Sequence, residues 1–143
     1  MEKSILEKIR SEYKPKLPQA LKGNVKAVEG EPTNSVRDQQ IIKSLFPNTY
    51  GMPIVRFEPG EETTHHAINV GVILSGGQAP GGHNVISGLF DEIKRLNPEN
   101  RLFGFLLGPG GLVSHEYMEI TSELIEDYRN TGGFDMIGSG RTK

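Results

Sequence analysis

The stretch "SGGQAPGGHN" occupies residues 75–84, and four of its ten residues are glycine. An apolar run, residues 68–74, precedes it, and a segment with apolar side chains at helical spacing, residues 85–96, follows it. Glycine destabilises the interior of a helix or a strand, because its backbone loses the most conformational freedom on folding. We therefore expect residues 75–84 to form a loop that joins a strand to a helix.

The same order of elements recurs further along the chain. Residues 68–74 and 102–107 are short apolar runs of the kind found in strands that are buried on both faces of a sheet. Apolar side chains at helical spacing predict helices over 85–96 and 118–128, and residues 134–137 are a candidate third strand. Strands that alternate with helices predict an α/β fold, in which helices cover both faces of a parallel sheet.

A glycine cluster follows each of the three candidate strands, at residues 76–82, 108–111 and 138–140. The carboxyl ends of parallel strands meet at one edge of a sheet, and the ligands of such sheets bind there. The N–H groups of a glycine loop and the positive end of the following helix dipole attract an anion, most often a phosphate. Tight turns alone would explain one cluster as well, but three clusters at one edge favour a phosphate site.

Residues 1–67 are expected to form a mostly helical extension. Apolar spacing predicts a helix over residues 5–13 and another over residues 35–46, which is capped by the serine at its start. Residues 19–34 show no periodicity and are expected to be a loop, and residues 53–57 are a candidate short strand.

Composition limits the classes of function. The chain has 143 residues, a formal net charge of −2 and no cysteine. This length suits one domain, and the charge shows no sign of a nucleic-acid or anionic-membrane partner. The lack of cysteine excludes disulfides, thiol catalysis and cysteine-bound zinc. No apolar run reaches the roughly 20 residues that cross a bilayer, and the start does not resemble a signal peptide, so a cytoplasmic protein is expected.

The loop at residues 75–84 matches neither of the common phosphate-binding fingerprints. A P-loop requires Gly-x-x-x-x-Gly-Lys-Ser/Thr, but no lysine follows Gly81 or Gly82. The dinucleotide pattern Gly-x-Gly-x-x-Gly fails as well, and Pro80 would hinder the close helix packing that this pattern serves. A phosphate loop of a third kind is therefore expected.

Residues 75–84 closely resemble the first phosphate loop of phosphofructokinases, whose general form is Gly-Gly-Asp-x-Pro-Gly. Gln78 in place of the aspartate, and the continuation "GHN" at 82–84, are similar to the long, pyrophosphate-dependent subclass. Two further stretches agree with this family, "GFLLGPGGL" at 104–112 and "NTGGFDMIGSGRTK" at 130–143. Three motifs in the family's order make the resemblance specific.

The resemblance implies a phosphofructokinase-like domain with three Rossmann-type layers and a phosphotransferase of glycolysis. The implied reaction transfers a phosphoryl group from pyrophosphate to fructose 6-phosphate, giving fructose 1,6-bisphosphate and phosphate, reversibly and with Mg²⁺. A homodimer is expected, with no nucleic-acid or membrane partner. ATP as the donor, or a non-catalytic regulatory subunit of this fold, remain alternatives, although the intact pair Gly76 and Gly77 argues against such a subunit.

The resemblance also implies which residues bind the donor phosphate. In the family the first glycine of the loop, here Gly76, touches that phosphate, and the arginine of the Gly-Ser-x-Arg motif, here Arg141, contacts it as well. Backbone amides and a guanidinium fork suit oxygens whose charge is redistributed during phosphoryl transfer. The implied donor-phosphate residues are Gly76, Gly77, Gln78, Gly81, Arg141, Thr142 and Lys143.

The family's magnesium-binding acid and its general base, the aspartate of a Thr-Ile-Asp-Gly-Asp motif, have no counterpart in this sequence. No catalytic residue and no metal ligand are therefore expected within the chain, and the remainder of the same subunit is an expected partner. Residues 1–67 are then an N-terminal extension, and residues 68–143 are the first part of the donor-phosphate-binding domain. Such an incomplete domain is expected to be inactive alone.

Other titratable residues have simpler explanations. The adjacent pair His65–His66 is expected in an exposed linker, because the two side chains diverge and no third metal ligand is near in sequence. Two roles remain possible for His83, which lies beside the glycine loop: it could contact the phosphate, or it could cap the helix. His115 and Glu116 are expected at an exposed helix start, and Asp135 has no partner that would suggest catalysis. A solvated helix face is expected for Glu123, Glu126 and Asp127.

Overall fold

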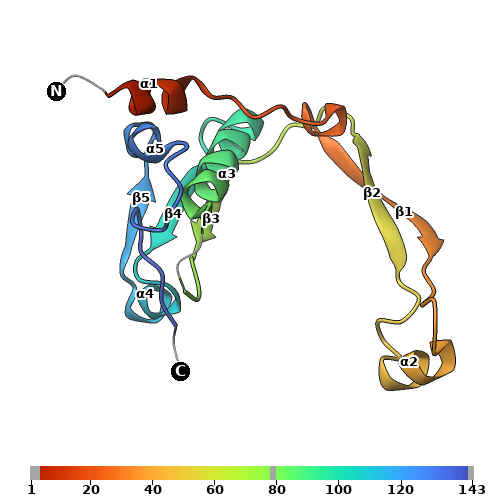
Figure 1. Cartoon of the computed structure of the whole chain (residues 1–143). Coiled ribbons are helices and arrows are strands. Elements are labelled where there is room, and N and C mark those ends of the chain that lie inside the picture. The colour runs from red at the N-terminus through yellow and green to blue at the C-terminus, as the bar shows by residue number, and fades with distance from the viewer. Residues whose placement is uncertain (1–3, 78–79, 142–143) are drawn as a thin grey trace. The chain divides into compact units, whose positions relative to one another are not determined.

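The computed structural model describes residues 4–77 and 80–141 of the chain (Figure 1). Three of the expected phosphate-binding residues lie outside this part of the chain: Gln78, Thr142 and Lys143. Within the described part, no helix combines the length and the apolar character that spanning a membrane requires.

Two compact units make up the chain. One combines Met1–Lys14 with Thr64–Lys143, and the other is Pro15–Thr63. The first unit contains all three glycine clusters, so the candidate site belongs to it.

The first unit is built on a three-stranded sheet with the strand order β3–β4–β5. Its strands are β3 (Asn69–Val72), β4 (Arg101–Phe105) and β5 (Tyr117–Ile120). β3 and β4 are parallel, and the helix α3 (Gly82–Leu96) connects them, which confirms the predicted order of strand, glycine loop, helix and strand. β5 runs antiparallel to β4, so this α/β unit has a mixed sheet rather than a wholly parallel one.

The two faces of this sheet differ in character. Side chains alternate along a strand, and the register places Val70, Leu102 and Ile120 in one row on the core face. Asn69 and Gly71 of β3 lie on the opposite face and are exposed. The prediction that β3 is buried on both faces was therefore wrong, because a polar side chain and a glycine occupy its second face.

The helix α3 covers the core face of the sheet. Its residues Ile86, Phe90 and Ile93 are spaced to lie on one side of the helix, and all three are buried. Val85, which was predicted on the same stripe, is 66% exposed. The buried apolar core comprises Leu74, Ile86, Phe90, Ile93, Leu102, Ile120, Ile125, Met136 and Ile137.

Two predicted elements that follow β4 were placed wrongly. Residues 108–111 are not a plain loop, because helix α4 (Pro109–Ser114) begins there with proline in its first turn, where proline suits a helix. The predicted helix over 118–128 is also too long, since its first residues form β5. The helix α5 (Ser122–Tyr128) starts only after Thr121, whose hydroxyl accepts the N–H of Leu124.

Residues 134–137 form a turn and not the predicted third strand. The N–H of Gly138 donates to the carbonyl of Phe134 at 2.7 Å, which closes the chain on itself. Met136 and Ile137 are nevertheless buried. The apolar pattern thus predicted correctly that these residues are buried, but it did not predict the correct type of secondary structure.

The predicted N-terminal helix is confirmed as α1 (Ile5–Glu12). A capping box starts it: the Ser4 hydroxyl accepts the N–H of Glu7 at 3.2 Å, and the Glu7 carboxylate accepts the N–H of Ser4 at 2.6 Å. At the other end, the side-chain amide of Asn130 donates to the carbonyls of Arg10 at 2.8 Å and Tyr13 at 3.1 Å. The end of α1 is thereby fixed to the turn that follows α5.

The second unit contains a two-stranded antiparallel sheet. Its strands are β1 (Val25–Pro32) and β2 (Pro53–Pro59), which pair along most of their length. β2 confirms the strand predicted at 53–57, but β1 lies within the predicted loop 19–34. Residues 1–67 are therefore not mostly helical, because these two strands pair with each other although residues 33–52 separate them in the sequence.

Two short helical elements complete the second unit, the 3-10 helix η1 (Gln19–Leu21) and the helix α2 (Gln39–Leu45). α2 begins later than predicted, since Asp38 and not Ser35 is its N-cap residue. Asp38 has a left-handed backbone with φ of 54°, a conformation that aspartate tolerates better than most residues. Val36, which was predicted on the apolar stripe of this helix, is 97% exposed.

Candidate phosphate-binding site

The chain that leaves β3 pairs with a distant glycine-containing segment, Ile137–Gly140, which we call the bridging segment. The N–H of Gly76 donates to the carbonyl of Gly140 at 3.0 Å, and the N–H of Gly140 donates to the carbonyl of Leu74 at 3.3 Å. Ser75 and Gly140 form a parallel β-bridge. The first glycine loop therefore begins in direct contact with the third glycine cluster.

The chain that leaves β4 lies along the bridging segment too. The N–H of Leu107 donates to the carbonyl of Ile137 at 2.8 Å. Gly108 has φ of 81°, and a Cβ there would lie 2.5 Å from the nitrogen of Gly140. Only glycine fits at this crossing, because both the positive φ and the close approach exclude a side chain. The three glycine clusters therefore meet at the carboxyl ends of β3 and β4, although the third follows a turn and not the predicted strand.

Arg141 follows the bridging segment and returns to the first glycine loop. Its Nη2 atom lies 3.6 Å from the position that a Cβ on Gly77 would take. Gly76 has φ of 108°, and apart from its two chain neighbours no described residue has a heavy atom within 4 Å of its Cβ position. The Arg141 side chain is exposed, and a guanidinium presents paired donors that match phosphate oxygens. The structure thus brings Gly76, Gly77 and Arg141 together beside open space.

The helix α3 starts where the first loop ends. Gly81 is its N-cap residue with φ of 97°, and its carbonyl accepts the N–H of Val85 at 3.0 Å. The backbones of Gly82 and Gly133 approach so closely that a Cβ at Gly82 would lie 2.5 Å from the Gly133 oxygen. The N-terminus of a long helix carries partial positive charge, which stabilises an anion beside it. The helix start that the sequence predicts beside the loop is present.

His83 is buried under this junction, with a relative exposure of 1%. Its Nε2 accepts the N–H of Met136 at 3.1 Å, and its Nδ1 lies 2.9 Å from the hydroxyl of Thr131. The ring of Tyr128 packs against it edge-on, with centroids 4.7 Å apart. Burial lowers the pKa of His83, while the nearby carboxylate of Asp135 acts in the opposite direction. His83 therefore links the start of α3 to the buried chain around Thr131 and Met136. Neither of the two sequence-based explanations included this structural role.

No three His, Cys, Asp or Glu side chains of the described residues gather closely enough to hold a metal ion. The pair His65–His66 is exposed, as expected. His115 ends α4, with a left-handed backbone of φ 57°, so the predicted helix start at this position was wrong. The Asp135 side chain is 76% exposed.

An ion-pair network that the sequence does not signal joins α5 to α3. Arg129 donates to both carboxylate oxygens of Asp91, at 2.8 and 2.9 Å, and to Glu126 at 2.9 Å. These hydrogen bonds, chiefly those to Asp91, raise the pKa of the guanidinium. The N–H of Asn130 next to it donates to the Asn84 side chain at 2.9 Å. The predicted polar face of α5 is confirmed as exposed at Glu123, Glu126 and Asp127.

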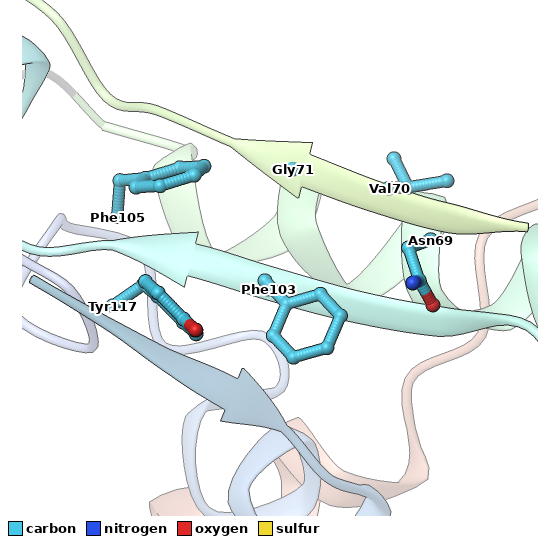
Figure 2. A pocket seen from close by; sticks show the side chains of 6 residues that line it. All are labelled: Asn69, Val70, Gly71, Phe103, Phe105 and Tyr117. Atoms are coloured by element: carbon cyan, nitrogen blue, oxygen red, sulfur yellow. The ribbon is translucent and has the colours of Figure 1, made fainter. Parts of the chain in front are cut away.

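The other face of the sheet carries a cavity of about 390 Å³ (Figure 2). The ring of Tyr117 makes edge contacts with Phe103 and Phe105, with centroids 5.7 and 5.8 Å apart. Gly71 leaves room for the Phe105 ring, because a Cβ there would lie 2.8 Å from it. The cavity is lined by Asn69, Val70, Gly71, Phe103, Phe105 and Tyr117, and this uncharged, aromatic lining does not suit a phosphate.

The chain is similar over its whole length to proteins of known name. A pyrophosphate–fructose 6-phosphate 1-phosphotransferase of Porphyromonas gingivalis is 62% identical over 100% of the chain. Proteins of the same name from Entamoeba histolytica and Treponema pallidum are 49% and 45% identical over 100% and 98% of the chain. The chain spans about a quarter of the length of these relatives, 26%, 27% and 27% respectively. No protein-family model matches it.

Proposed function

Since the chain belongs to the family of pyrophosphate–fructose 6-phosphate 1-phosphotransferases, we propose that the complete protein phosphorylates fructose 6-phosphate with pyrophosphate. The products are fructose 1,6-bisphosphate and phosphate, and the reaction is a reversible step of glycolysis. The identity of 62% over the whole chain is the observation that carries this proposal. The activity is assigned to the complete subunit, because the chain spans only 26% of that relative.

In this proposal the first glycine loop and Arg141 hold the donor pyrophosphate. The N–H of Gly76 already donates to the carbonyl of Gly140, so we assign the contacts with the anion to the N–H groups of Gly77 and of Gly81, the N-cap residue of α3. The missing side chains at Gly76 and Gly77 give the phosphate access to the backbone. We also assign Gln78, Thr142 and Lys143 to this site, from the family resemblance alone.

These groups suit the electrostatic part of phosphoryl transfer. As the bond between phosphorus and the bridging oxygen breaks, negative charge moves onto the leaving phosphate, and fixed donors that face this charge lower the barrier. The guanidinium of Arg141 and the N-terminus of α3 supply such donors at the first loop. The acceptor hydroxyl must also lose a proton, and we assign the base that takes it to the remainder of the subunit.

We propose Mg²⁺ as the cofactor of the complete protein. Mg²⁺ prefers six oxygen ligands, commonly one or two carboxylates together with phosphate oxygens and water. No cluster of three acidic or histidine side chains occurs in the part of the chain that the structure describes. We therefore assign the metal ligands to the remainder of the subunit.

We propose that the parallel pair β3–β4 is the start of a larger parallel sheet in a three-layer, phosphofructokinase-like domain. Residues 68–143 are then its first part, and residues 1–67 are an extension that precedes it. The connection of β3 to β4 through α3 supports this arrangement, because such units build parallel sheets. A homodimer and a cytoplasmic location complete the proposal.

An assay of the complete, purified protein tests the function. Fructose 6-phosphate and Mg²⁺ are supplied with either pyrophosphate or ATP, and fructose 1,6-bisphosphate is measured. We expect product with pyrophosphate and none with ATP, and we expect phosphate to drive the reverse reaction. Product with ATP alone would support the ATP-dependent alternative, and no turnover with either donor would favour a non-catalytic subunit.

A further inference from the structure

We infer that His83 is a positioning residue of the donor-phosphate site, whose imidazole sets the place of the bridging segment, and thus of Arg141, relative to the first glycine loop. The inference rests on the proposed function. His83 acts here through the backbone that it binds and does not itself touch the phosphate.

His83 binds one turn of the chain with both its main chain and its side chain. Its N–H donates to the carbonyl of Gly133 at 3.0 Å, and its Nε2 accepts the N–H of Met136 at 3.1 Å. Met136 directly precedes the bridging segment in the sequence. The second residue of α3, at the end of the first glycine loop, therefore holds the start of the segment that carries Arg141.

The partners of His83 fix where its proton sits. Nε2 faces the N–H of Met136 and must be unprotonated, so Nδ1 carries the hydrogen and donates to the Thr131 hydroxyl, 2.9 Å away. That hydroxyl in turn donates to the carbonyl of Tyr128 at 2.6 Å. A directed chain of hydrogen bonds thus runs from the imidazole to the end of α5. The Thr131 hydroxyl also lies 3.3 Å from the carbonyl of Gly132, and its shorter hydrogen bond to Tyr128 leaves its lone pairs facing the Nδ1 hydrogen.

The bridging segment transmits the position of Met136 to Arg141. At its far end Gly140 is bonded to Leu74 and Gly76, so four residues span the distance between the His83 tie and the first loop. A displacement of Met136 should therefore also displace Arg141, because only these four residues lie between the two. A shift of about 1 Å in a positioning group can cost on the order of 100-fold in rate, even when the change is remote from the reacting atoms.

Protonation of His83 would break the hydrogen bond between its Nε2 and the N–H of Met136. It would place an N–H at Nε2 against the N–H of Met136, and two donors cannot bond to each other. Two ionisable groups face the ring, the phenol of Tyr128 from α5 and the carboxylate of Asp135 from the turn. Asp135 Oδ1 lies 3.8 Å from Nε2, so its carboxylate would draw a protonated ring away from Met136. The neutral ring is therefore the form that positions the segment.

The test uses the complete protein and three variants. His83→Ala removes both ring contacts, His83→Gln keeps an acceptor near the Nε2 position, and Thr131→Val removes the acceptor of the Nδ1 hydrogen at similar volume. We expect His83→Ala to raise the KM for pyrophosphate about tenfold or more, while the KM for fructose 6-phosphate changes less than about twofold. His83→Gln should restore most of the loss, and Thr131→Val should lie between. The exposed His66 gives the control variant His66→Ala, which should match the wild type.

A pH series separates positioning from a general structural role. The ratio of the pyrophosphate KM of the wild type to that of His83→Gln cancels the titration of pyrophosphate itself. Burial lowers the pKa of His83 in the folded protein, so we expect this ratio to stay flat around pH 6.5 and to rise only at lower pH, where the wild type alone loses its acceptor. A side chain that merely supports folding would leave the ratio flat.

Two failures can be told apart. A wild type that uses pyrophosphate, with an unchanged pyrophosphate KM in His83→Ala and Thr131→Val, would overturn the positioning role and leave the proposed function intact. A wild type without pyrophosphate-dependent turnover would overturn the proposed function instead. Calorimetric titration of the same variants with pyrophosphate would then decide the inference about His83. If His83→Ala does not fold, His83→Gln and Thr131→Val decide it.

Discussion

Arg141 Nη2 lies 3.6 Å from the point that a Cβ on Gly77 would occupy, so the arginine stands directly beside the first glycine loop. The two residues come from opposite ends of the α/β part of the chain, and the bridging segment brings them together. A phosphate that binds the loop backbone here also meets the guanidinium. Both a side chain added to the loop and the loss of the guanidinium should therefore damage the same function.

Gly76→Asp should abolish donor binding in the complete protein. The new carboxylate would occupy the open space in which we place the anion, and φ of 108° strains any side chain at this position. Because a like charge next to a bound anion costs several kcal/mol, the KM for pyrophosphate should rise about 100-fold or more. Steady-state kinetics measure this change. Gly88→Asp adds the same charge at an exposed position on α3 with open space around it, and it should leave the KM unchanged. Equal donor affinity in Gly76→Asp and the wild type would sink the assignment.

Arg141→Ala should lower kcat/KM for pyrophosphate by an amount equivalent to about 2–4 kcal/mol, since it removes a charged donor that faces the transferred charge. Arg141→Lys should recover only part of this loss, because a point charge replaces a bidentate fork. Arg37, exposed in the second unit, provides the matched control Arg37→Ala. Full turnover in Arg141→Ala would show that the arginine is a neighbour of the site and not part of it.

The stability of the protein should fall as the pH drops below 6.5, and His83 should cause part of this loss. Burial lowers the pKa of His83 in the folded state, so the unfolded chain takes up its proton first. The loss begins near the ordinary pKa of 6.5 and is complete at the lower folded pKa. The carboxyl pKa values of Glu92 and Glu119 are lowered from 4.5, so their contribution is lost at more acidic pH. Thermal denaturation between pH 7 and 5 should show a smaller loss in His83→Gln than in the wild type, and identical slopes would contradict this account.

Asn100→Ala should destabilise the first unit by about 1–3 kcal/mol, because the N–H of Ile68 loses its partner and the carbonyl of Ile93 keeps only the hydrogen bond from the N–H of Asn97. The side chain of Asn100, 1% exposed, accepts the N–H of Ile68 at 2.8 Å and donates to the carbonyl of Ile93 at 2.7 Å. Hydrogen exchange should show faster exchange of the Ile68 amide, and the melting temperature should fall. Asn48→Ala, at an exposed position in the second unit, is the control. An unchanged Ile68 amide would mean that its hydrogen bond contributes little.

The 143 residues alone should not phosphorylate fructose 6-phosphate. Phosphoryl transfer to a sugar needs a base for the hydroxyl proton and a metal ion for the phosphate charge, and positioning of the donor does not replace either. Product formation is measured with a preparation whose mass has been verified, and with the complete protein as the positive control. Steady turnover by the isolated chain would show that it holds a base we have not identified.

Elements with strong local periodicity could be predicted from the sequence, and elements defined by distant partners could not. The stripe of Ile86, Phe90 and Ile93 specifies α3 by itself. β1 has no such signal, because its residues become a strand only through pairing with β2. Met118 fits both a strand and the first turn of a helix, and its antiparallel pairing with Gly104 decides for β5.

The candidate site divides in the same way. The meeting of the first two glycine clusters follows from topology, since the carboxyl ends of the parallel strands β3 and β4 share one edge, and it could be predicted before any contact was known. The third cluster joins them through the hydrogen bonds of the bridging segment, although the residues before it form a turn and not the predicted strand. The role of His83 could not be predicted, because its partners Thr131 and Met136 lie 48 and 53 residues away. Nothing in the sequence around His83 indicates that the turn at residues 134–137 will pack against its side chain.

In the bridging segment, the number of residues is constrained as strictly as their identity. It is bonded to Leu107 at one end and to Leu74 at the other, with Ile137 in the core and Arg141 beside Gly77. Gly138 within it has φ of 69°, so the segment is not regular extended backbone. Because the segment is hydrogen-bonded at both ends, an added or deleted residue would either displace Arg141 from the loop or break one of these hydrogen bonds. Changes of length in the bridging segment should therefore reduce function, whether one residue or two are added.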